Sequence, residues 1–501
     1  MSKVTRRCCS AVIVLTCLAS HVLAQTEDLY FPASAYAVGA NNSFFVHEVE
    51  VFNPLDTAET FRLYWLPRNQ NNSSAAFADV PVEPGQAVRF GNILAEVFGL
   101  TPSGVGALRV APSTGDLHFH STIINTSAGG TLGQIIPAVP ESAAFTDTEA
   151  ATILHLGEDN DRRTNIFCVN TTGSSLTMSI DLLSTTGALL RENWSFVLEP
   201  WSSLQVNRVY QQYAPVDGYL RIDSATAGGK GICLAAVVNN LTNDPLTEPA
   251  VKAADAAPES YVPFAASTAT ESTDLSLFAP SGAALARIDL LRSGIDNTVP
   301  LTIDVPVAAG QEVRLIDLLD GTFGHSGTGA LRLTAVSGEL LASSQTAISV
   351  PAGEMLRSVQ PIATAGQFAS GDMALLIHLT ESVDVRTDIG AVNSSADPLD
   401  LVISLHDAMG TALGSIPLQL QPFGHDQIDA VFAAAGHPNV PDGFATVRTT
   451  TSAGSFFAYA TVTDLRTNDA YHVKPETVCG LIFRDGFESG DSSAWSGDGG
   501  G

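Results

Sequence analysis

The stretch DVPVEPGQAVRFGNILAEVFG (residues 79–99) returns later in the chain as DVPVAAGQEVRLIDLLDGTFG (304–324). A second stretch, ILHLGEDNDRRTNI (153–166), returns as LIHLTESVDVRTDI (376–389). The first pair lies 225 residues apart, from 79 to 304, and the second lies 223 apart, from 153 to 376. A long unit is therefore repeated in tandem with few insertions, which is typical of an array of structural modules.

Each long unit divides again into two parts that share one order of strand-like runs and turns. The connecting stretches, such as 137–151 and 247–260, are rich in Pro, Ala, Ser and acidic residues, and we expect them to be linkers that bury little. The pattern predicts four modules in the order A-B-A′-B′. Their expected ranges are 29–140 for module A, 148–250 for B, 259–364 for A′ and 373–474 for B′, followed by a flexible tail over 475–501.

Alternation of apolar and polar residues is the main local pattern, and it predicts half-buried antiparallel strands. In the run 45–51, Glu48 and Glu50 fall on the face opposite His47, Val49 and the other inward positions. In the run 61–65, the apolar set is Phe61, Leu63 and Trp65. Helical periodicity is confined to one or two turns around 92–98, 316–320 and 428–434. We therefore expect an all-β chain of four tandem immunoglobulin-like β-sandwich modules.

The N-terminus has the pattern of a secretory signal peptide. Lys3, Arg6 and Arg7 precede a short apolar run, and Val22-Leu23-Ala24 predicts cleavage after Ala24. A lipoprotein interpretation centred on Cys17 is the alternative, but Thr16 precedes that cysteine where signal peptidase II prefers a smaller residue. Since no later apolar run approaches about 20 residues, no membrane span is expected in the mature chain. The protein is expected to be secreted or held at the cell surface.

The charge balance is strongly acidic, with 52 Asp and Glu against 24 Lys and Arg. Loss of the three basic residues of the leader changes the net charge from −28 to −31. Such a surface repels nucleic acid and anionic lipid headgroups, so nucleic acid is excluded as a partner. The 45% of hydrophobic residues is enough to give each module a core of its own.

Three cysteines remain after the leader is removed, namely Cys168, Cys233 and Cys479. Cys168 and Cys233 lie 65 residues apart at inward positions, a spacing that joins two strands across an immunoglobulin-like sandwich. In module B′ the matching positions are Ala391 and Ala458, so both thiols are absent together. We therefore predict a Cys168–Cys233 disulfide, with two buried free thiols as the alternative. Cys479 is left without a partner in the sequence.

Two groups of residues could hold a metal ion. His118 and His120 share one strand face, but the second copy has Leu341 and Ser343 there, so ordinary strand positions are the better interpretation. The acidic run 158–161 has the density of a calcium loop without the Gly and distal Glu of an EF-hand. The weak Ca²⁺ candidates are Glu158, Asp161, Glu381 and Asp384.

One polar cluster is kept in both B modules, because His155, Glu158, Asp161 and Arg163 recur 223 residues later as His378, Glu381, Asp384 and Arg386. We predict that each arginine pairs with the acids of its own module and holds the loop against the first strand.

No catalytic set is found. Gly324-His325-Ser326-Gly327 lacks the final Gly of a nucleophile elbow and is better explained as a polar turn. There is no phosphate-binding loop and no dinucleotide fingerprint, so no cofactor is expected.

The runs VPFAAST (262–268), GALRV (106–110) and NLTNDP (240–245) resemble tandem immunoglobulin-like modules found in uncharacterised secreted proteins of environmental Gram-negative bacteria. The closing FRDGFESGDSSAWS (483–496) is similar to a short DGFESGD-type tail at the ends of exported proteins from such organisms. This resemblance implies location and fold, and it implies no activity.

The sequence therefore predicts an exported, non-enzymatic structural or interaction protein with an unknown protein or glycan partner outside the cytoplasm. The alternative is a carbohydrate-binding array, or accessory domains associated with secreted hydrolases. That alternative would need exposed aromatic platforms, for which the candidates are Tyr64, Trp65, Trp194, Trp201 and Tyr210.

Overall fold

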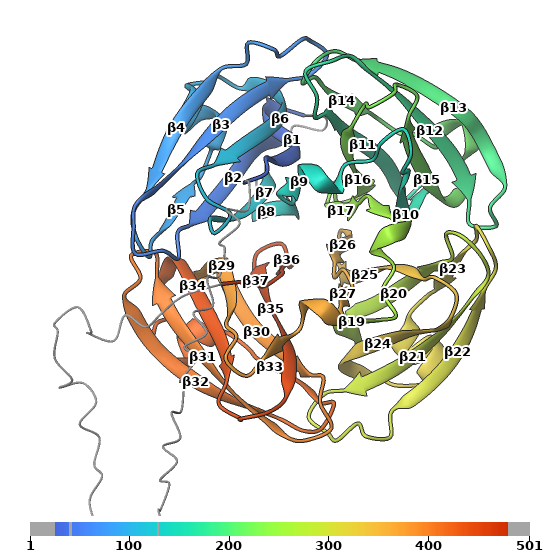
Figure 1. Ribbon diagram of the computed structural model, residues 1–501. Coiled ribbons are helices and arrows are strands. Elements are labelled where there is room, and N and C mark those ends of the chain that lie inside the picture. The colour runs from blue at the N-terminus through green and yellow to red at the C-terminus, as the bar shows by residue number, and fades with distance from the viewer. Residues whose placement is uncertain (1–25, 40–42, 128–129, 479–501) are drawn as a thin grey trace, which may run out of the picture.

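The computed structural model describes residues 26–39, 43–127 and 130–478. The predicted leader, Cys479 and the residues that resemble an export tail lie outside the described residues. Antiparallel strands make up most of the structure, and helices are limited to single short pieces (Figure 1). The expected all-β class is confirmed.

The strands and helices of the first half, modules A and B, occupy the following ranges. In module A they are β1 (Leu29–Val38), β2 (Phe44–Phe52), β3 (Glu59–Pro67), β4 (Phe77–Val82), β5 (Ala87–Phe90), α1 (Ile93–Phe98), β6 (Ser103–Pro112), β7 (His118–Ser127), β8 (Gly130–Ile135), β9 (Val139–Pro140) and η2 (Glu141–Ala143). In module B they are β10 (Ala151–Glu158), β11 (Arg162–Asn170), β12 (Leu176–Ser184), β13 (Leu189–Leu198), β14 (Ser203–Val206), η3 (Gln211–Tyr213), β15 (Val216–Ser224), β16 (Gly231–Asn239), β17 (Pro245–Pro249), β18 (Val251–Lys252) and η4 (Ala253–Asp255).

The second half, modules A′ and B′, follows the same plan. In module A′ the elements are β19 (Glu259–Ser267), β20 (Glu271–Phe278), β21 (Ala284–Arg292), β22 (Leu301–Val307), β23 (Glu312–Leu315), η5 (Leu318–Thr322), β24 (Gly327–Ser337), β25 (Leu341–Val350), β26 (Gly353–Ser358), β27 (Ile362–Ala363) and η6 (Thr364–Gly366). In module B′ they are β28 (Phe368–Ala369), β29 (Ala374–Glu381), β30 (Val385–Asn393), β31 (Leu399–Asp407), β32 (Ala412–Leu420), β33 (His425–Ile428), α2 (Val431–Ala434), β34 (Val440–Thr449), β35 (Ser455–Asp464), β36 (Asp469–Val473) and β37 (Glu476–Thr477).

The strand order within a module is clearest in module B. One layer has the order β13-β12-β15-β10-β18 and the other has the order β14-β11-β16-β17. Module A has the same neighbours, but β1 pairs with both β6 and β2, so its strands form one continuous sheet. Apolar residues at alternate positions of facing strands pack between the layers, as the alternation predicted.

This connectivity is not that of an immunoglobulin domain. There the first strand lies beside the second, in the order A-B-E-D. In module B the first strand, β10, pairs with the sixth, β15, and the second, β11, lies in the opposite layer. Alternation tells which residues of a strand face inward, but it carries no information on which strand lies next to it. The sequence therefore predicted the strands and missed their order.

The disulfide between Cys168 and Cys233 is present and lies in the core of module B. Its position differs from the predicted one, because β11 and β16 are neighbours in one sheet and the two residues are directly opposite in register, with Cα atoms 4.1 Å apart. The bond therefore joins adjacent strands of one layer and does not bridge two layers. Ala391 lies opposite Ala458 at the same place in module B′.

Several local expectations can be compared with the structure. The three predicted helical pieces are present as α1, η5 and α2. The predicted linkers bury more than expected, because Phe145 belongs to the core of module B and Glu248 is buried. The expected tail begins too early, since β37 pairs with β29 and Val478 packs beside Phe52. The Pro- and Ala-rich composition of these stretches predicted exposure, and it carried no information on the strands that pack against them.

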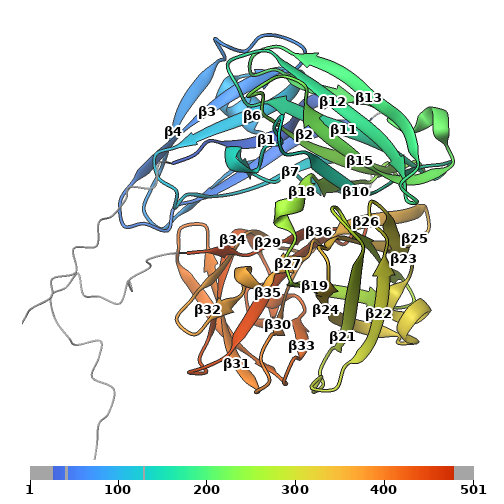
Figure 2. The same cartoon turned by 45° about the vertical axis from the view of Figure 1, so that its right-hand side comes forward.

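The four modules close into a ring, with B′ packed against A (Figures 1 and 2). The junction between A and B carries a parallel bridge of Arg68 with Ser203, and the junction between A′ and B′ carries a bridge of Ser293 with His425 at the corresponding place. In the first, Asn72 donates to the carbonyl of Trp201; in the second, Asn297 donates to the carbonyl of Phe423.

The two remaining junctions also correspond to each other. Between B and A′, the rings of Tyr219 and Phe278 lie 4.8 Å apart. Between B′ and A, the rings of Phe444 and Phe52 lie 4.7 Å apart. The chain runs directly from B into A′, whereas B′ meets A through side-chain and backbone contacts alone. The ring is therefore closed by a junction that repeats an internal one.

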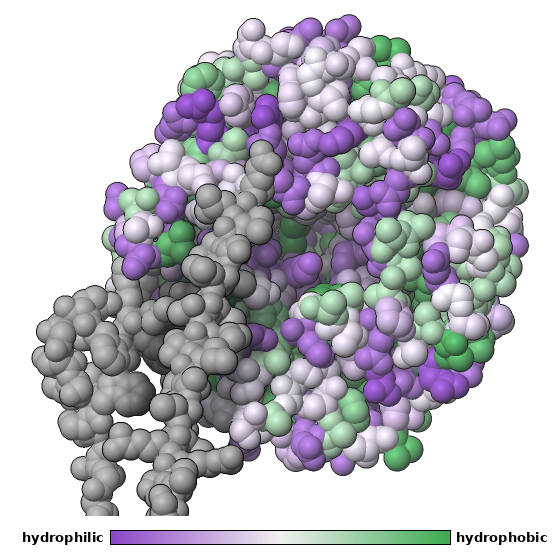
Figure 3. Space-filling model, viewed as in Figure 1, coloured by the Kyte–Doolittle hydropathy of each residue, from purple (hydrophilic) through white to green (hydrophobic). Residues whose placement is uncertain are grey.

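Four strands, one from each module, surround the centre of the ring: β8, β17, β26 and β36. Their residues line a cavity of about 300 Å³. Asp244 accepts a hydrogen bond from the backbone of Leu356, the corresponding Asp469 accepts one from Gly133, and the two carboxyl groups bond to each other. In Figure 3 the surface is hollowed at the middle of the ring, and polar and apolar residues are mixed around it.

Candidate ligand-binding cavity between modules A and B

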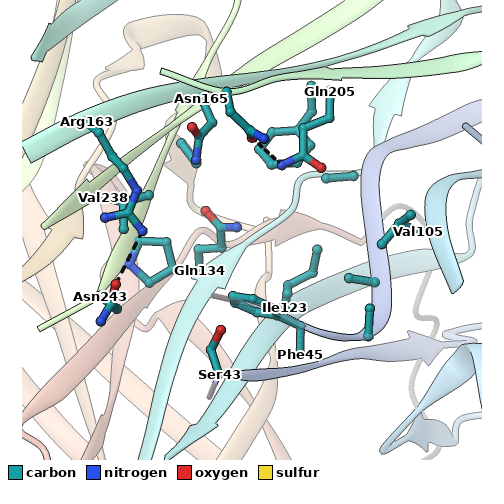
Figure 4. A pocket seen from close by; sticks show the side chains of 18 of the residues that line it. Ser43, Phe45, Val105, Ile123, Gln134, Arg163, Asn165, Gln205, Val238 and Asn243 are labelled. Atoms are coloured by element: carbon teal, nitrogen blue, oxygen red, sulfur yellow. Dashed lines mark hydrogen bonds between the residues drawn. The ribbon is translucent and has the colours of Figure 1, made fainter. Parts of the chain in front are cut away.

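A cavity of about 930 Å³ lies between modules A and B. Strands β1, β2, β6, β7 and β8 contribute residues from module A, and β11, β14, β16 and β17 contribute residues from module B. Figure 4 shows the amide groups of Gln134, Asn165 and Gln205 around one space, with Phe45 and Ile123 below them. The cavity therefore combines a polar wall with an apolar floor, as small-molecule sites do.

At and around this cavity the first half has smaller residues at several places where the second half has bulkier ones. Residues correspond here when they hold the same place in the strand register of the two halves. The first half has Ala33, Gln134, Ser203, Leu234 and Thr247 where the second half has Phe264, Arg357, His425, Tyr459 and His472.

Those bulky residues pack against one another at the junction of A′ and B′. The ring of Tyr459 stacks on His472 at 5.0 Å and contacts Phe264 at 5.9 Å, and the guanidinium of Arg357 lies 4.6 Å from the Phe264 ring centre. The Tyr459 hydroxyl is bonded to His425 Nε2 at 2.8 Å. Gly390 allows this, because a Cβ there would lie 2.3 Å from the Tyr459 ring; module B has Phe167 instead. The same junction is therefore filled by side chains between A′ and B′ and contains a cavity between A and B.

Two arginines in the cavity wall have neutral partners. Arg68 Nη1 donates to Gln205 Oε1 at 2.8 Å, and Arg163 donates to Asn240 at 2.6 Å and Asn243 at 3.4 Å. Among the described residues neither arginine forms an ion pair with a carboxylate. Burial, followed by the neighbouring Arg208, lowers the pKa of Arg163, but an arginine keeps its proton at neutral pH.

The third cavity arginine, Arg208, is neutralised. Its Nε donates at 2.8 Å to Glu158, whose carboxylate is fully buried and also accepts from the backbone of Tyr210. The acid Asp159 lines the cavity as well and is paired with Arg162 at 3.3 Å. Positive charge without an anionic partner is thus confined to Arg68 and Arg163.

A serine and a histidine are hydrogen bonded at the edge of the cavity. Ser34 Oγ lies 2.7 Å from His47 Nδ1, and His47 Nε2 lies 3.0 Å from Ser121 Oγ. Because Ser121 gives its own hydrogen to the carbonyl of Ile136, His47 Nε2 is the donor and Nδ1 accepts from Ser34. Burial lowers the pKa of His47 to about 3, so this imidazole is a weak base at neutral pH. The pair does not meet the requirement for activating a serine nucleophile.

The predicted calcium acids do not converge. Glu158 points into the protein toward Arg208, whereas Asp161 is exposed. Glu381 is buried and accepts from the backbone of Thr387, and burial raises its pKa. Asp384 is exposed and lies 3.8 Å from Arg466. Among the described residues, no group of three or more His, Cys, Asp and Glu side chains is arranged to hold a metal ion.

The predicted pairing of each arginine with acids of its own module is found for Arg386, although with an acid of its strand and not of the loop, and it is not found for Arg163. Arg163 bonds the amides of Asn240 and Asn243, and Arg386 bonds Asp388, two residues further along its own strand, at 2.8 Å. Glu158 forms an ion pair with Arg208 instead, and the sequence pattern did not predict this pair.

The conserved histidines of this cluster act through the backbone. His155 and His378 have positive φ angles of 61° and 65°, each inside an irregular pairing of the first strand of its module. This conformation turns their N–H groups toward acids of the next module in the ring: His155 donates to Glu312 at 2.7 Å and His378 to Glu50 at 3.0 Å. The recurrence of this histidine in both B modules therefore corresponds to a hydrogen bond between neighbouring modules.

Other titratable groups are buried at the junction of B′ and A. The His120 ring stacks on the His378 ring at 4.7 Å, and His118 Nδ1 lies 4.0 Å from Glu476. Burial lowers the pKa of both stacked histidines well below the usual value. Burial and the neighbouring Glu50 raise the pKa of Asp442 to about 8. These buried groups contact one another across the junction of the two modules.

The aromatic candidates for a glycan platform do not form one. Trp65 and Tyr210 are core residues, and Trp194 packs against Phe196 and Arg191. The guanidinium of Arg109 lies between Tyr64 and Trp201, 4.8 and 4.4 Å from their ring centres.

Comparisons with known proteins give no family for this chain. None of the protein-family models compared with it matches, and no curated protein matches its sequence. Among solved structures it is similar to dimeric latent PorU from Porphyromonas gingivalis, with 10% sequence identity and a TM-score of 0.13, over 72% of this chain and 32% of that chain. A TM-score this low carries no argument. In the part of the chain that the structure describes, no helix has the length and apolar character to cross a membrane.

Proposed function

We propose that the chain is exported and acts outside the cytoplasm as a non-enzymatic interaction protein, with the cavity between modules A and B as its binding site. One observation carries the proposal: the junction of A′ and B′ is packed with bulky side chains, while the corresponding junction of A and B has small residues and a cavity of about 930 Å³. A cavity of this size lies in the range of natural ligand sites, about 300–1,000 Å³.

The predicted leader, the acidic composition and the Cys168–Cys233 disulfide support a location outside the cytoplasm. The closed ring supports a scaffold role, since each module is held on two sides and the site between A and B is built on strands. The four modules are proposed to descend from one β-sandwich unit, because their strand orders correspond.

The test is a binding screen of the mature chain by thermal shift and calorimetry against sugars, sugar acids, amino acids and short peptides. Asn207→Trp, at an exposed cavity position, should block entry without disturbing the core. Ala33→Phe with Ser203→His copies the packing of the second half and should abolish binding as well. Phe264→Ala, in the second half, is the matched control and should leave binding unchanged. No ligand for the wild-type chain, or equal binding by the blocked variants, would overturn the proposal.

A further inference from the structure

We propose that the cavity between A and B binds a carboxylate-bearing, hydroxyl-rich molecule, a sugar acid in mono- or oligomeric form, with Arg163 and Arg68 as the carboxylate-binding residues. This rests on the proposed function and names the class of ligand for that site.

The two halves differ in charge around an arginine that both retain at this junction, Arg163 in module B and Arg386 in module B′. In module B′, Arg386 is neutralised by Asp388 at 2.8 Å. In module B, Arg163 is retained, but the position of Asp388 is taken by Asn165. An amide replaces the carboxylate, so Arg163 keeps a charge that no acid of its own strand balances. A buried or half-buried arginine without an anion is costly, and an anionic ligand supplies the missing partner.

Other cavity positions change in the same direction. Asn207 stands where module B′ has Asp429, and Arg68 stands where module A′ has Ser293. Two changes run the other way, Gln134 for Arg357 and Asp159 for Ser382, but Asp159 is already paired with Arg162. In a chain with a net charge of −28, a cavity wall with two unbalanced arginines selects anions.

The rest of the wall suits hydroxyl groups. Gln134, Asn165, Gln205 and Asn207 all carry amides, and each amide both donates and accepts hydrogen bonds, as a sugar hydroxyl requires. The apolar floor of Phe45 and Ile123 can cover the C–H face of a sugar ring. Simple anions such as sulfate would use the arginines and leave the amides without ligand partners.

The experiment is isothermal titration calorimetry of the full mature chain with galacturonic acid and its dimer and trimer, with the neutral galactose oligomers and with citrate and sulfate. We expect the uronates to bind, with an affinity that falls as salt is raised. Arg163→Gln should weaken binding by tenfold or more. Asn165→Asp, which copies Asp388 and gives Arg163 an internal anion, should weaken it similarly. The aspartate can still accept the hydrogen bond that the backbone N–H of Arg208 donates to Asn165 Oδ1 at 3.0 Å. Arg386→Gln and Asp388→Asn, at the corresponding positions of module B′, are matched controls and should leave uronate affinity unchanged.

The outcomes separate this inference from the proposed function. One outcome is that neutral oligomers bind as tightly as the uronates, that Asn165→Asp has no effect and that Asn207→Trp abolishes binding. This result would support the cavity as the binding site and overturn its preference for an acid. Citrate or sulfate binding as tightly as the uronates would overturn the sugar part. If every probe fails here and in the wider screen, both proposals fall.

Discussion

The backbone N–H of His378, in the last module, donates a hydrogen bond of 3.0 Å to the carboxylate of Glu50, in the first. At the corresponding junction inside the chain, the N–H of His155 donates to Glu312 at 2.7 Å. Glu50 lies on β2, and Glu312 lies on β23, which pairs with the strand that corresponds to β2. Different strands of the two halves thus provide the same acceptor for the same kind of backbone donor.

Glu50→Ala should loosen the closure of the ring. The change removes the acceptor of a buried N–H, which costs on the order of 1–3 kcal/mol. Hydrogen exchange should show faster exchange at the His378 amide, with the His155 amide unaffected. Glu50→Gln is the matched control: because burial raises the pKa of Glu50, a neutral side chain of the same shape should be tolerated. Unchanged protection of His378 in the alanine variant would argue against a role of this bond in closure.

Replacing Cys168 and Cys233 together by alanine should lower stability and preserve the fold. A loop of 65 residues contributes up to roughly 4 kcal/mol in the chain-entropy model. The alanine pair is compatible with the sheet, because Ala391 and Ala458 lie opposite each other in module B′. Chemical denaturation of the double variant, with the reduced wild-type chain beside it, measures the loss. An unaltered midpoint in both would show that the bond contributes nothing to stability.

The contribution of Glu248 to stability should fall as the pH rises from about 4.5 to 8. Burial raises the pKa of Glu248 to about 8, although Ser343, Gln345 and Gln360 donate to its carboxylate and oppose that rise, and nearby Glu312 adds to it. The folded state binds this proton more tightly than the unfolded state, so the contribution is full below the ordinary pKa of 4.5 and is lost as the pH rises through 8.

The matching variant is Glu248→Gln. The denaturation free energy of the wild type minus that of this variant should fall as the pH rises, by at most about 1.4 kcal/mol per pH unit within the window. Asp442, whose pKa is also raised, remains in both proteins, so the difference reports on Glu248 alone. Parallel pH profiles for the two chains would contradict the assignment.

Tyr459→Leu should destabilise the junction of A′ and B′ by about 2–4 kcal/mol, because it opens a cavity and leaves His425 without its hydroxyl partner. Tyr459→Phe keeps the ring and removes only the hydroxyl, so it should cost about half as much. Thermal or urea unfolding of the two variants measures the costs. Equal costs would place the whole effect in the hydrogen bonds and none in packing.

The strands and their inner faces could be predicted from the sequence. The burial of the outer face of some strands by a neighbouring module could not. Phe61, Leu63 and Trp65 are inward as alternation predicts, at 1%, 1% and 7% exposure. Glu50 fell on the face expected to meet solvent, yet it is fully buried against module B′. The alternation of apolar and polar residues reports on packing within one module. It does not indicate which outer faces are covered by the next module.

The cavity was missed because nine separate strands contribute to its lining and no local motif marks it. A signal was nevertheless present in the two copies. Aligned by their offset of 223, they show Asn165 against Asp388 beside a retained arginine at 163 and 386. A change of charge next to an unchanged arginine is the kind of difference that distinguishes a binding site from a structural ion pair.

The repeated junctions have a consequence for how the molecule is assembled. Modules A and B together carry both faces of the junction that joins B to A′ and B′ to A, so two separate A-B units would have the surfaces to form the same ring as a two-fold dimer. Joining the two units in one chain makes their association independent of protein concentration. It also allows the two copies to differ in sequence, so that one A-B junction can stay packed while the other has smaller side chains and binds a ligand. A dimer of a single gene product cannot have this asymmetry.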